Sequence, residues 1–155
     1  MKTFAIRLLV VALIVGGSGA QASAQGVKSD SVVKITAKAG KLGADGSQEV
    51  TLTVKVEKPY HIYANPVAND TLKSVQTTLK FVTNLEGEPK IDYPDGKVIE
   101  NKDLGNYKTY EGEVTIKANV RRAKGDTAPL ELTVKVQACD DSKCLLPATI
   151  KVKAE

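Results

Sequence analysis

The chain has 155 residues, and its 22 lysines and arginines outnumber its 18 aspartates and glutamates to give a formal net charge of +4. Two of the positive charges, Lys2 and Arg7, lie in the N-terminal segment, so the remaining chain carries +2, which does not indicate nucleic-acid binding. There is no tryptophan, and one of the two phenylalanines is Phe4, so the core of a single domain of this length must be aliphatic.

Residues 1–24 have the pattern of a secretory signal peptide. A short positively charged start accompanies an almost wholly apolar run over residues 5–15, and small-x-small cleavage sites follow, the second at residues 22–24. The apolar run is too short to span a bilayer, which takes about 20 apolar residues. We predict cleavage near Ala24, which leaves an exported single-domain chain of residues 25–155 without a membrane span.

Alternating apolar and polar residues predict β-strands along the mature chain. The alternation is clearest over residues 48–57, where valine or leucine occupies every second position from Val50 to Val56, as in a strand with one buried face. No stretch has a helical period. Further strands are predicted over residues 31–39, 72–82, 113–120, 130–136 and 148–153.

The segment between the predicted strands at residues 48–57 and 72–82 is rich in aromatic residues. Tyr60, His61, Ile62 and Tyr63 contain two of the five tyrosines and the only histidine. In an extended segment His61 and Tyr63 share one face, and their two neighbours share the other. One interpretation is that Tyr60 and Ile62 fill the core while His61 caps an edge.

Residues 98–110 lack a convincing period and mix charged, amide and glycine residues with two tyrosines. We predict a long loop there, and long loops inside compact domains often carry function. With turn signals about every ten residues and about seven or eight strands once short extended segments such as residues 60–63 are included, the chain is predicted to have an all-β fold, an immunoglobulin-like antiparallel β-sandwich. A closed barrel is the main structural alternative.

Cys139 and Cys144 lie between the last two predicted strands and are the only cysteines. In an exported protein they allow a single intramolecular disulfide. A ring this small stabilises a fold by roughly 2 kcal/mol, so its placement favours redox chemistry, while a structural staple stays the alternative. Asp140 and Asp141 disfavour a thiolate at Cys139, whereas Lys143 favours one at Cys144, which suits exchange with docked partners only.

A metal site formed by Cys139, Cys144 and His61 is a third interpretation, because thiolate and imidazole ligands can hold copper or zinc. The cysteines lack the usual paired ligand spacing, and no fourth ligand is evident in the sequence. We therefore expect no metal and no other cofactor.

Three sequence features together resemble a known family. Residues 137–139, a short acidic and lysine-containing spacer, and residues 144–147, combined with residues 60–63 upstream, resemble the N-terminal periplasmic domain of the thiol:disulfide interchange protein DsbD. The resemblance spans roughly residues 48–152. It implies an immunoglobulin-like sandwich whose cysteine pair receives electrons from a thioredoxin-like domain and reduces periplasmic partners, including disulfide isomerase.

The resemblance also implies roles for individual residues. Cys139 and Cys144 match the redox pair, and Cys144 is expected to form the mixed disulfide with the electron acceptor. His61 and Tyr63 match the flanking aromatic positions. Residues 100–105 fall where the family has a cap loop that covers the disulfide until a partner docks. The predicted cap residues are Asn101, Lys102, Asp103 and Leu104, of which only Leu104 is apolar where the family commonly has an aromatic residue.

These features predict a periplasmic thiol–disulfide exchange protein, with possible protein-disulfide reductase activity, that relays electrons through Cys139 and Cys144. The expected donor is a thioredoxin-like protein or a membrane electron donor, and the expected acceptor is a periplasmic disulfide-containing protein. Because the sequence ends at Glu155 without a membrane domain or a thioredoxin-like domain, we expect the donor to be a separate protein. The alternative is a non-catalytic β-sandwich binding module with a structural disulfide.

Overall fold

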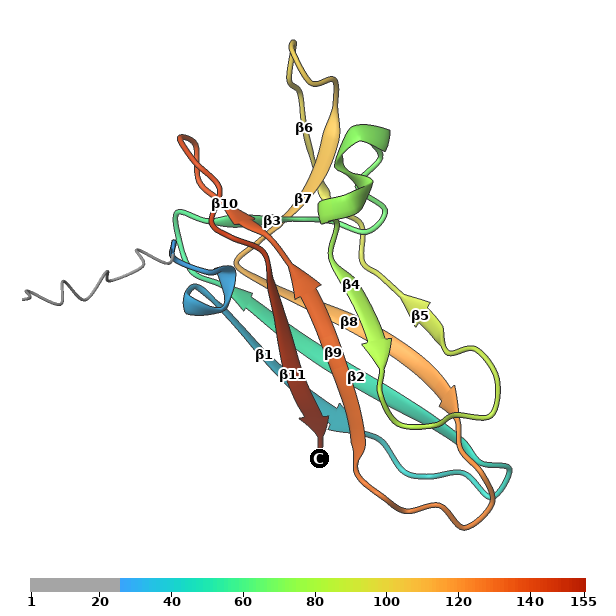
Figure 1. The fold of residues 1–155 in the computed structure, drawn as a ribbon. Helices are drawn as coiled ribbons and strands as arrows, with labels where there is room; N and C mark the ends of the chain where they lie inside the picture. Colours follow the sequence, from blue (N-terminus) through green and yellow to red (C-terminus); the bar gives the residue numbers. More distant parts are fainter. Residues whose placement is uncertain (1–25) are drawn as a thin grey trace, which may run out of the picture.

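A computed structural model describes residues 26–155, and the predicted signal peptide lies outside the described residues. Within the described part the fold is all-β, with eleven strands and two short 3-10 helices (Figure 1). No helix there is long and apolar enough to cross a membrane. The elements are η1 (Ser29–Ser31), β1 (Val33–Ala39), β2 (Ser47–Val56), β3 (His61–Tyr63), η2 (Asp70–Val75), β4 (Thr78–Phe81), β5 (Lys90–Asp92), β6 (Lys97–Ile99), β7 (Tyr107–Glu111), β8 (Glu113–Arg121), β9 (Leu130–Val136), β10 (Ala138–Cys139) and β11 (Ala148–Ala154).

The strands form one large sheet and one small sheet. The large sheet has the order β4-β9-β11-β1-β2-β8-β5, and among its described pairs only β1 and β11 are parallel. It folds over on itself, so that β4, β9 and β11 lie in front of β1, β2 and β8 in Figure 1. The sheet ends at β4 and β5, and therefore does not close as a barrel. The predicted β-sandwich is confirmed, with one parallel pair that was not expected.

Aliphatic side chains fill the space between the two layers, as the composition predicts. On β2, Val50, Leu52 and Val54 are fully buried, and the residues between them are more exposed. They pack in one cluster with inward-facing residues of β8 and β9, such as Ile116 and Leu132. Burial of each such side chain contributes about 1.5–3 kcal/mol relative to an exposed one, so this cluster holds the two layers together.

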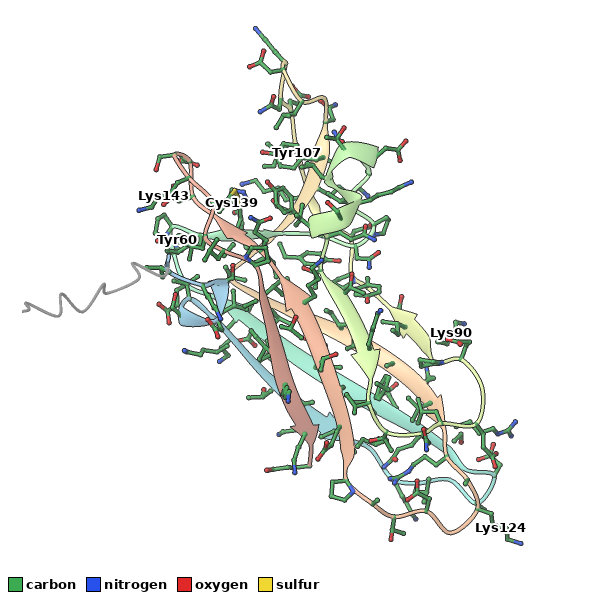
Figure 2. The ribbon with its side chains drawn as sticks, viewed as in Figure 1. Tyr60, Lys90, Tyr107, Lys124, Cys139 and Lys143 are labelled. Atoms are coloured by element: carbon green, nitrogen blue, oxygen red, sulfur yellow. A yellow bond between two sulfur atoms is a disulfide. The ribbon has the colours of Figure 1, made fainter. Side chains whose placement is uncertain are left out.

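The small sheet lies at one end of the sandwich, in the order β10-β3-β7-β6 (Figure 1). β3 pairs with β7 on one side and β10 on the other, which places His61 opposite Cys139. Tyr110 on β7 joins the sheet to the core, because its ring is buried and its hydroxyl donates to the carbonyl oxygens of Pro94 at 2.8 Å and Asn65 at 3.1 Å. Figure 2 shows Cys139 at this end of the molecule.

The prediction of a long loop over residues 98–110 is wrong at both ends, which belong to β6 and β7. β6 and β7 form a hairpin in which Ile99 pairs with Tyr107, so only the tip of the hairpin is irregular. The sequence hides the second strand because Thr109 and the tyrosine after it are both buried, which breaks the alternation of a strand with one buried face.

The strand predicted over residues 72–82 is shorter than expected. Its first half belongs to η2, which begins after Asn69, where the asparagine side chain accepts a hydrogen bond from the Thr71 amide at 3.0 Å. Asparagine is a favoured residue at this capping position. The chain therefore completes a helical turn before β4 starts at Thr78.

Candidate thiol–disulfide site

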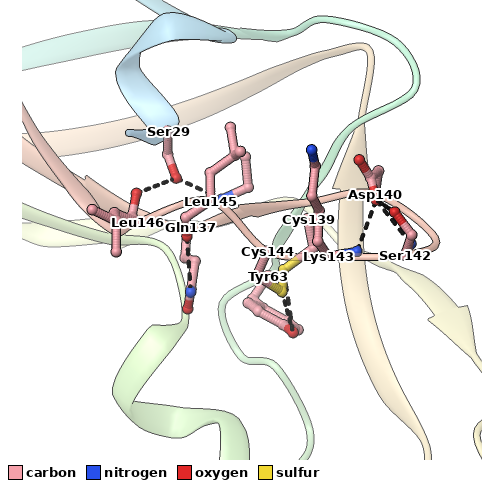
Figure 3. Close-up of a disulfide and its surroundings, with 11 residues drawn as sticks. Ser29, Tyr63, Gln137, Cys139, Asp140, Ser142, Lys143, Cys144, Leu145 and Leu146 are labelled. Carbon is pink, nitrogen blue, oxygen red and sulfur yellow. Dashed lines mark hydrogen bonds between the residues drawn. A yellow bond between two sulfur atoms is a disulfide. The ribbon is translucent and has the colours of Figure 1, made fainter. Parts of the chain in front are cut away.

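The two cysteines lie on a short hairpin where the chain passes from the large sheet to the small one. β9 pairs with β11 as far as Val136, and two residues later the chain joins β3 as β10. After Cys139 the chain turns back, which brings Cys144 opposite Cys139. We call residues 138–146 the cysteine hairpin (Figure 3).

Asp140 holds the turn of the cysteine hairpin. Its Oδ1 atom accepts hydrogen bonds from the Ser142 hydroxyl at 2.7 Å and from the amides of Ser142 at 2.8 Å and Lys143 at 2.9 Å. The Ser142 hydroxyl and these amides keep the pKa of Asp140 below its usual value, with a further contribution from the charge of Lys143. The turn is therefore built around a charged carboxylate next to Cys139.

Cys139 and Cys144 form a disulfide, with their Sγ atoms 2.01 Å apart. The backbone hydrogen bonds of the hairpin lie on either side of this pair, so the two cysteines face each other at a position without hydrogen bonds between them. Side chains at such positions approach each other most closely across an antiparallel pair. The single pairing expected from the cysteine count is present.

The two halves of the disulfide differ in exposure. Cys139 is only 3% exposed and packs against Tyr63 and Val67, whereas Cys144 is exposed. Cys144 is therefore the more exposed of the two cysteines, although both line the same cavity. This asymmetry is the main chemical feature of the site.

Tyr63 on β3 lies against both sulfur atoms. Its hydroxyl oxygen is 3.6 Å from Cys139 Sγ and 3.9 Å from Cys144 Sγ, and the hydroxyl is the donor because disulfide sulfurs carry no proton. Burial raises the pKa of Tyr63, and the adjacent Tyr107 raises it further. The phenol therefore stays protonated at neutral pH and remains able to donate to sulfur.

His61 lies directly opposite Cys139 in the pairing of β3 with β10. Its ring meets that of Tyr63 edge to face, with centroids 6.3 Å apart. Partial burial lowers the pKa of His61, although Glu111 and Asp141 act in the opposite direction. The predicted arrangement of His61 and Tyr63 on one face is present, with Ile62 buried in the main core behind them.

The disulfide borders an open cavity of about 460 Å³. The β6–β7 hairpin forms the opposite wall, where Lys97 pairs with Glu111 at 3.0 Å. Sequence reasoning missed this wall, because the pairing of β6 with β7 is not visible as a period. The wall residues are Lys97, Ile99, Tyr107 and Glu111.

The predicted cap residues lie at the tip of the β6–β7 hairpin. Asn101 forms the turn by accepting hydrogen bonds from the amides of Asp103 at 3.0 Å and Leu104 at 2.8 Å. Leu104 is 51% exposed, and its carbonyl accepts a hydrogen bond from the Asn69 side chain at 2.8 Å. Among the described residues, those that line the cavity do not include Lys102 or the three cap residues beside it, so the cap assignment stays a prediction.

Within residues 26–155 no group of three or more histidine, cysteine or acidic residues is arranged to hold a metal ion. Both thiols are instead joined to each other.

Comparison with solved structures shows what the fold resembles. The N-terminal periplasmic domain of ScsB from Proteus mirabilis is 15% identical with a TM-score of 0.58, over 77% of this chain and 45% of that chain, so the present chain spans less than half of that length. The reduced DsbD N-terminal domain of Neisseria meningitidis is 18% identical with a TM-score of 0.46, over 78% and 83% of the two chains. The DsbD N-terminal domain in its complex with the PilB N-terminal domain, also from Neisseria meningitidis, is 16% identical with a TM-score of 0.47, over 77% and 80%.

Comparison at the level of families is more specific. No curated protein matches the chain. The family model described as "Thiol:disulfide interchange protein DsbD, N-terminal" matches residues 25–155, which includes both cysteines and every described strand. This match confirms the family that the sequence resembles. The chain belongs to the DsbD N-terminal domain family.

Proposed function

We propose that residues 25–155 form a single periplasmic domain, released from a signal peptide at residues 1–24, that exchanges disulfides with other proteins. Cys139 and Cys144 pass two electrons from a thioredoxin-like or membrane donor to periplasmic disulfide-containing proteins. The observation that carries this proposal is the unequal disulfide at an open cavity: both cysteines line the cavity, but Cys144 is exposed whereas Cys139 is only 3% exposed.

Reduction of the domain begins with attack by a donor thiolate on Cys144 Sγ. The bond between the two cysteines breaks, a mixed disulfide forms at Cys144, and Cys139 leaves as a thiolate that takes up a proton. The second thiol of the donor then attacks the donor sulfur that is bonded to Cys144, and Cys144 is released as a thiol. The donor becomes a disulfide, and this domain gains two electrons and two protons.

Reduction of an acceptor runs through the same sulfur. The Cys144 thiolate attacks the acceptor disulfide, forms a mixed disulfide and releases one acceptor thiolate. Cys139 then attacks Cys144 Sγ, which restores the internal disulfide and releases the second acceptor thiolate. The five-residue separation of the cysteines along the hairpin keeps Cys139 in reach for this resolving step.

The flanking residues support these steps through hydrogen bonding and charge. The Tyr63 hydroxyl, 3.6 Å from Cys139 Sγ, donates to the thiolate that leaves when Cys144 is attacked. Asp140 is ionised beside Cys139 and disfavours a lasting negative charge there. We assign His61, together with Tyr63, to the wall of the cavity beside the disulfide. We assign the predicted cap residues, Asn101 to Leu104, to the surface that meets a docked partner.

Single-cysteine variants test the proposal. Cys139→Ser keeps the exposed thiol and lacks the resolving thiol, so it should accumulate a mixed disulfide with an acceptor. Cys144→Ser keeps only the buried thiol and serves as the matched control, which should accumulate none. The measurement is capture of a partner from periplasmic extract, detected as a band that disappears on reduction.

The equilibrium of the wild-type pair with glutathione separates exchange from a structural role. If the pair is an exchange site, its reduction potential, measured against glutathione, should lie near the potential of an oxidising compartment. A reduction potential well below about −300 mV, together with no mixed disulfide from either variant, would instead identify a structural staple in a non-catalytic binding module.

A further inference from the structure

The residues before β1 run along the outer side of the cysteine hairpin. We call residues 26–31 the N-terminal arm. Lys28 pairs with Leu146 in a parallel bridge, in which the Leu146 amide donates to the Val27 carbonyl at 3.0 Å and the Ser29 amide donates to the Leu146 carbonyl at 2.9 Å. The arm therefore acts as a further short strand beside the hairpin.

Ser29 of the arm is completely buried, although serine is mostly exposed in proteins. Its hydroxyl donates to the Leu146 carbonyl at 2.8 Å and accepts from the Ala138 amide at 2.9 Å (Figure 3). The second bond has a clear physical reason. Ala138 lies where the chain leaves β11 for β3, so its amide has no partner in the large sheet, and a buried amide needs one.

These two bonds meet at the base of the cysteine hairpin. Ala138 directly precedes Cys139, and Leu146 follows Cys144 by two residues. One hydroxyl therefore ties together the two strands that carry the two sulfurs. A group that favours the closed hairpin also favours the disulfide, since bringing the thiols together is part of the cost of forming it.

We propose that Ser29 is a positioning residue for the exchange site, which holds the base of the cysteine hairpin closed and thereby stabilises the disulfide form over the dithiol form. The inference rests on the proposed function, because it assigns Ser29 a role in setting the redox equilibrium of that pair. The coupling is reciprocal: the arm favours the disulfide, and the disulfide favours docking of the arm.

Ser29→Ala removes the hydroxyl and leaves the Ala138 amide without its partner. The equilibrium of the cysteine pair with glutathione should shift toward the dithiol by about threefold to tenfold. This shift corresponds to part of the free energy of one lost buried hydrogen bond. Ser31→Ala is the matched control, because the Ser31 hydroxyl donates only within the arm, to the Lys28 carbonyl at 2.7 Å. That control should stay within about twofold of wild type, and Ser29→Thr, which keeps the hydroxyl, should recover part of the shift.

Urea unfolding of the oxidised and reduced proteins distinguishes positioning from general stabilisation. Positioning requires Ser29→Ala to destabilise the oxidised protein more than the reduced one. If both forms lose the same stability and the equilibrium with glutathione is unchanged, Ser29 is a structural residue only and the inference is overturned.

Amide hydrogen exchange of the wild-type protein tests the same coupling without a variant, should Ser29→Ala fail to fold. Reduction of the disulfide should speed exchange at the amides of Ser29, Ala138 and Leu146 by about tenfold or more, because local opening controls exchange there. The amide of Val134 in the centre of β9 should keep its rate. Equal protection of the three amides in both redox states would overturn the inference.

Two experiments distinguish failure of this inference from failure of the proposed function. If Cys139→Ser captures no partner while Ser29→Ala still shifts the glutathione equilibrium, the coupling stands and the exchange function fails. If Cys139→Ser captures a partner and Ser29→Ala behaves as wild type, only the role of Ser29 is rejected.

Discussion

At the residue scale, the chemistry of the site depends on which sulfur meets solvent. Cys144 is exposed, and Cys139 is buried against Tyr63, next in sequence to the charged Asp140. The Tyr63 hydroxyl, 3.6 Å from Cys139 Sγ, can donate a hydrogen bond to a negative charge that forms there. Attack at the exposed sulfur with a stabilised leaving sulfur follows from this arrangement.

Tyr63→Phe removes that hydrogen bond and keeps the aromatic ring. We expect reduction of the disulfide by dithiothreitol at pH 7 to slow by about tenfold, the lower end of the effect of one hydrogen bond to a charged group. Stopped-flow measurement of the reduction rate checks this. Tyr107→Phe is the control, since that ring packs on Tyr63 at 5.9 Å between centroids and should change the rate less than twofold. Equal slowing in both variants would contradict the role of the Tyr63 hydroxyl.

At the scale of elements, the cysteine hairpin is a short structure held at both ends. Asp140 closes its turn with three hydrogen bonds to Oδ1, and Ser29 closes its base. β10 has only two residues and pairs with β3 alone as a named strand, so these side-chain bonds supplement a backbone ladder much shorter than that of β9. Closure of the hairpin therefore combines these side-chain bonds with two backbone hydrogen bonds, Asp140 N–H to Lys143 O and Leu145 N–H to Ala138 O, and with the disulfide.

Asp140→Ala removes the turn bonds, and Asp140→Asn keeps an oxygen acceptor while removing the same charge. We expect Asp140→Ala to shift the equilibrium with glutathione toward the dithiol by about twofold to fivefold more than Asp140→Asn, because only the alanine variant opens the turn. Titration of free thiols in glutathione buffers measures this difference. If both variants shift the equilibrium with glutathione equally from that of wild type, the charge of Asp140 is responsible and its turn hydrogen bonds are not.

At the scale of the whole molecule, the sandwich is a rigid support for a site at one end. The core cluster extends from β1 to β11 and includes Ile62 directly behind His61 and Tyr63. The small sheet is joined to this core through Tyr110, whose hydroxyl bonds fix the loops at Asn65 and Pro94. Stability and redox chemistry should therefore be largely separable.

Leu52→Ala tests that separation in the centre of the core. Leu52 is fully buried, so the variant should lose about 2–5 kcal/mol of unfolding free energy, while its equilibrium with glutathione should change less than twofold. Urea denaturation and thiol titration measure the two quantities. Val82→Ala is the surface control, because Val82 is exposed and its truncation should cost less than about 0.5 kcal/mol. A large redox shift in Leu52→Ala would show that core packing and the site are coupled.

Local sequence pattern predicted the strands that bury one face and expose the other. Val50 to Val56 on β2 alternate because one side of that strand meets the core and the other meets solvent. The pattern fails at β7, where Thr109 and Tyr110 are buried one after the other between the small sheet and the core. It also fails at η2, where the cap formed by Asn69 ends the extended chain.

The sequence by itself determined the class of the protein and its reactive pair, because only Cys139 and Cys144 can form an internal disulfide and their motif, with Tyr60 to Tyr63, identifies the family. Only the tertiary structure decided which sulfur is accessible and what supports it. Burial of Cys139 comes from β3 and the loop after it, and closure of the hairpin comes from Ser29, 109 residues away from Ala138. Such contacts depend on how distant strands meet, and no local pattern of residue types records them.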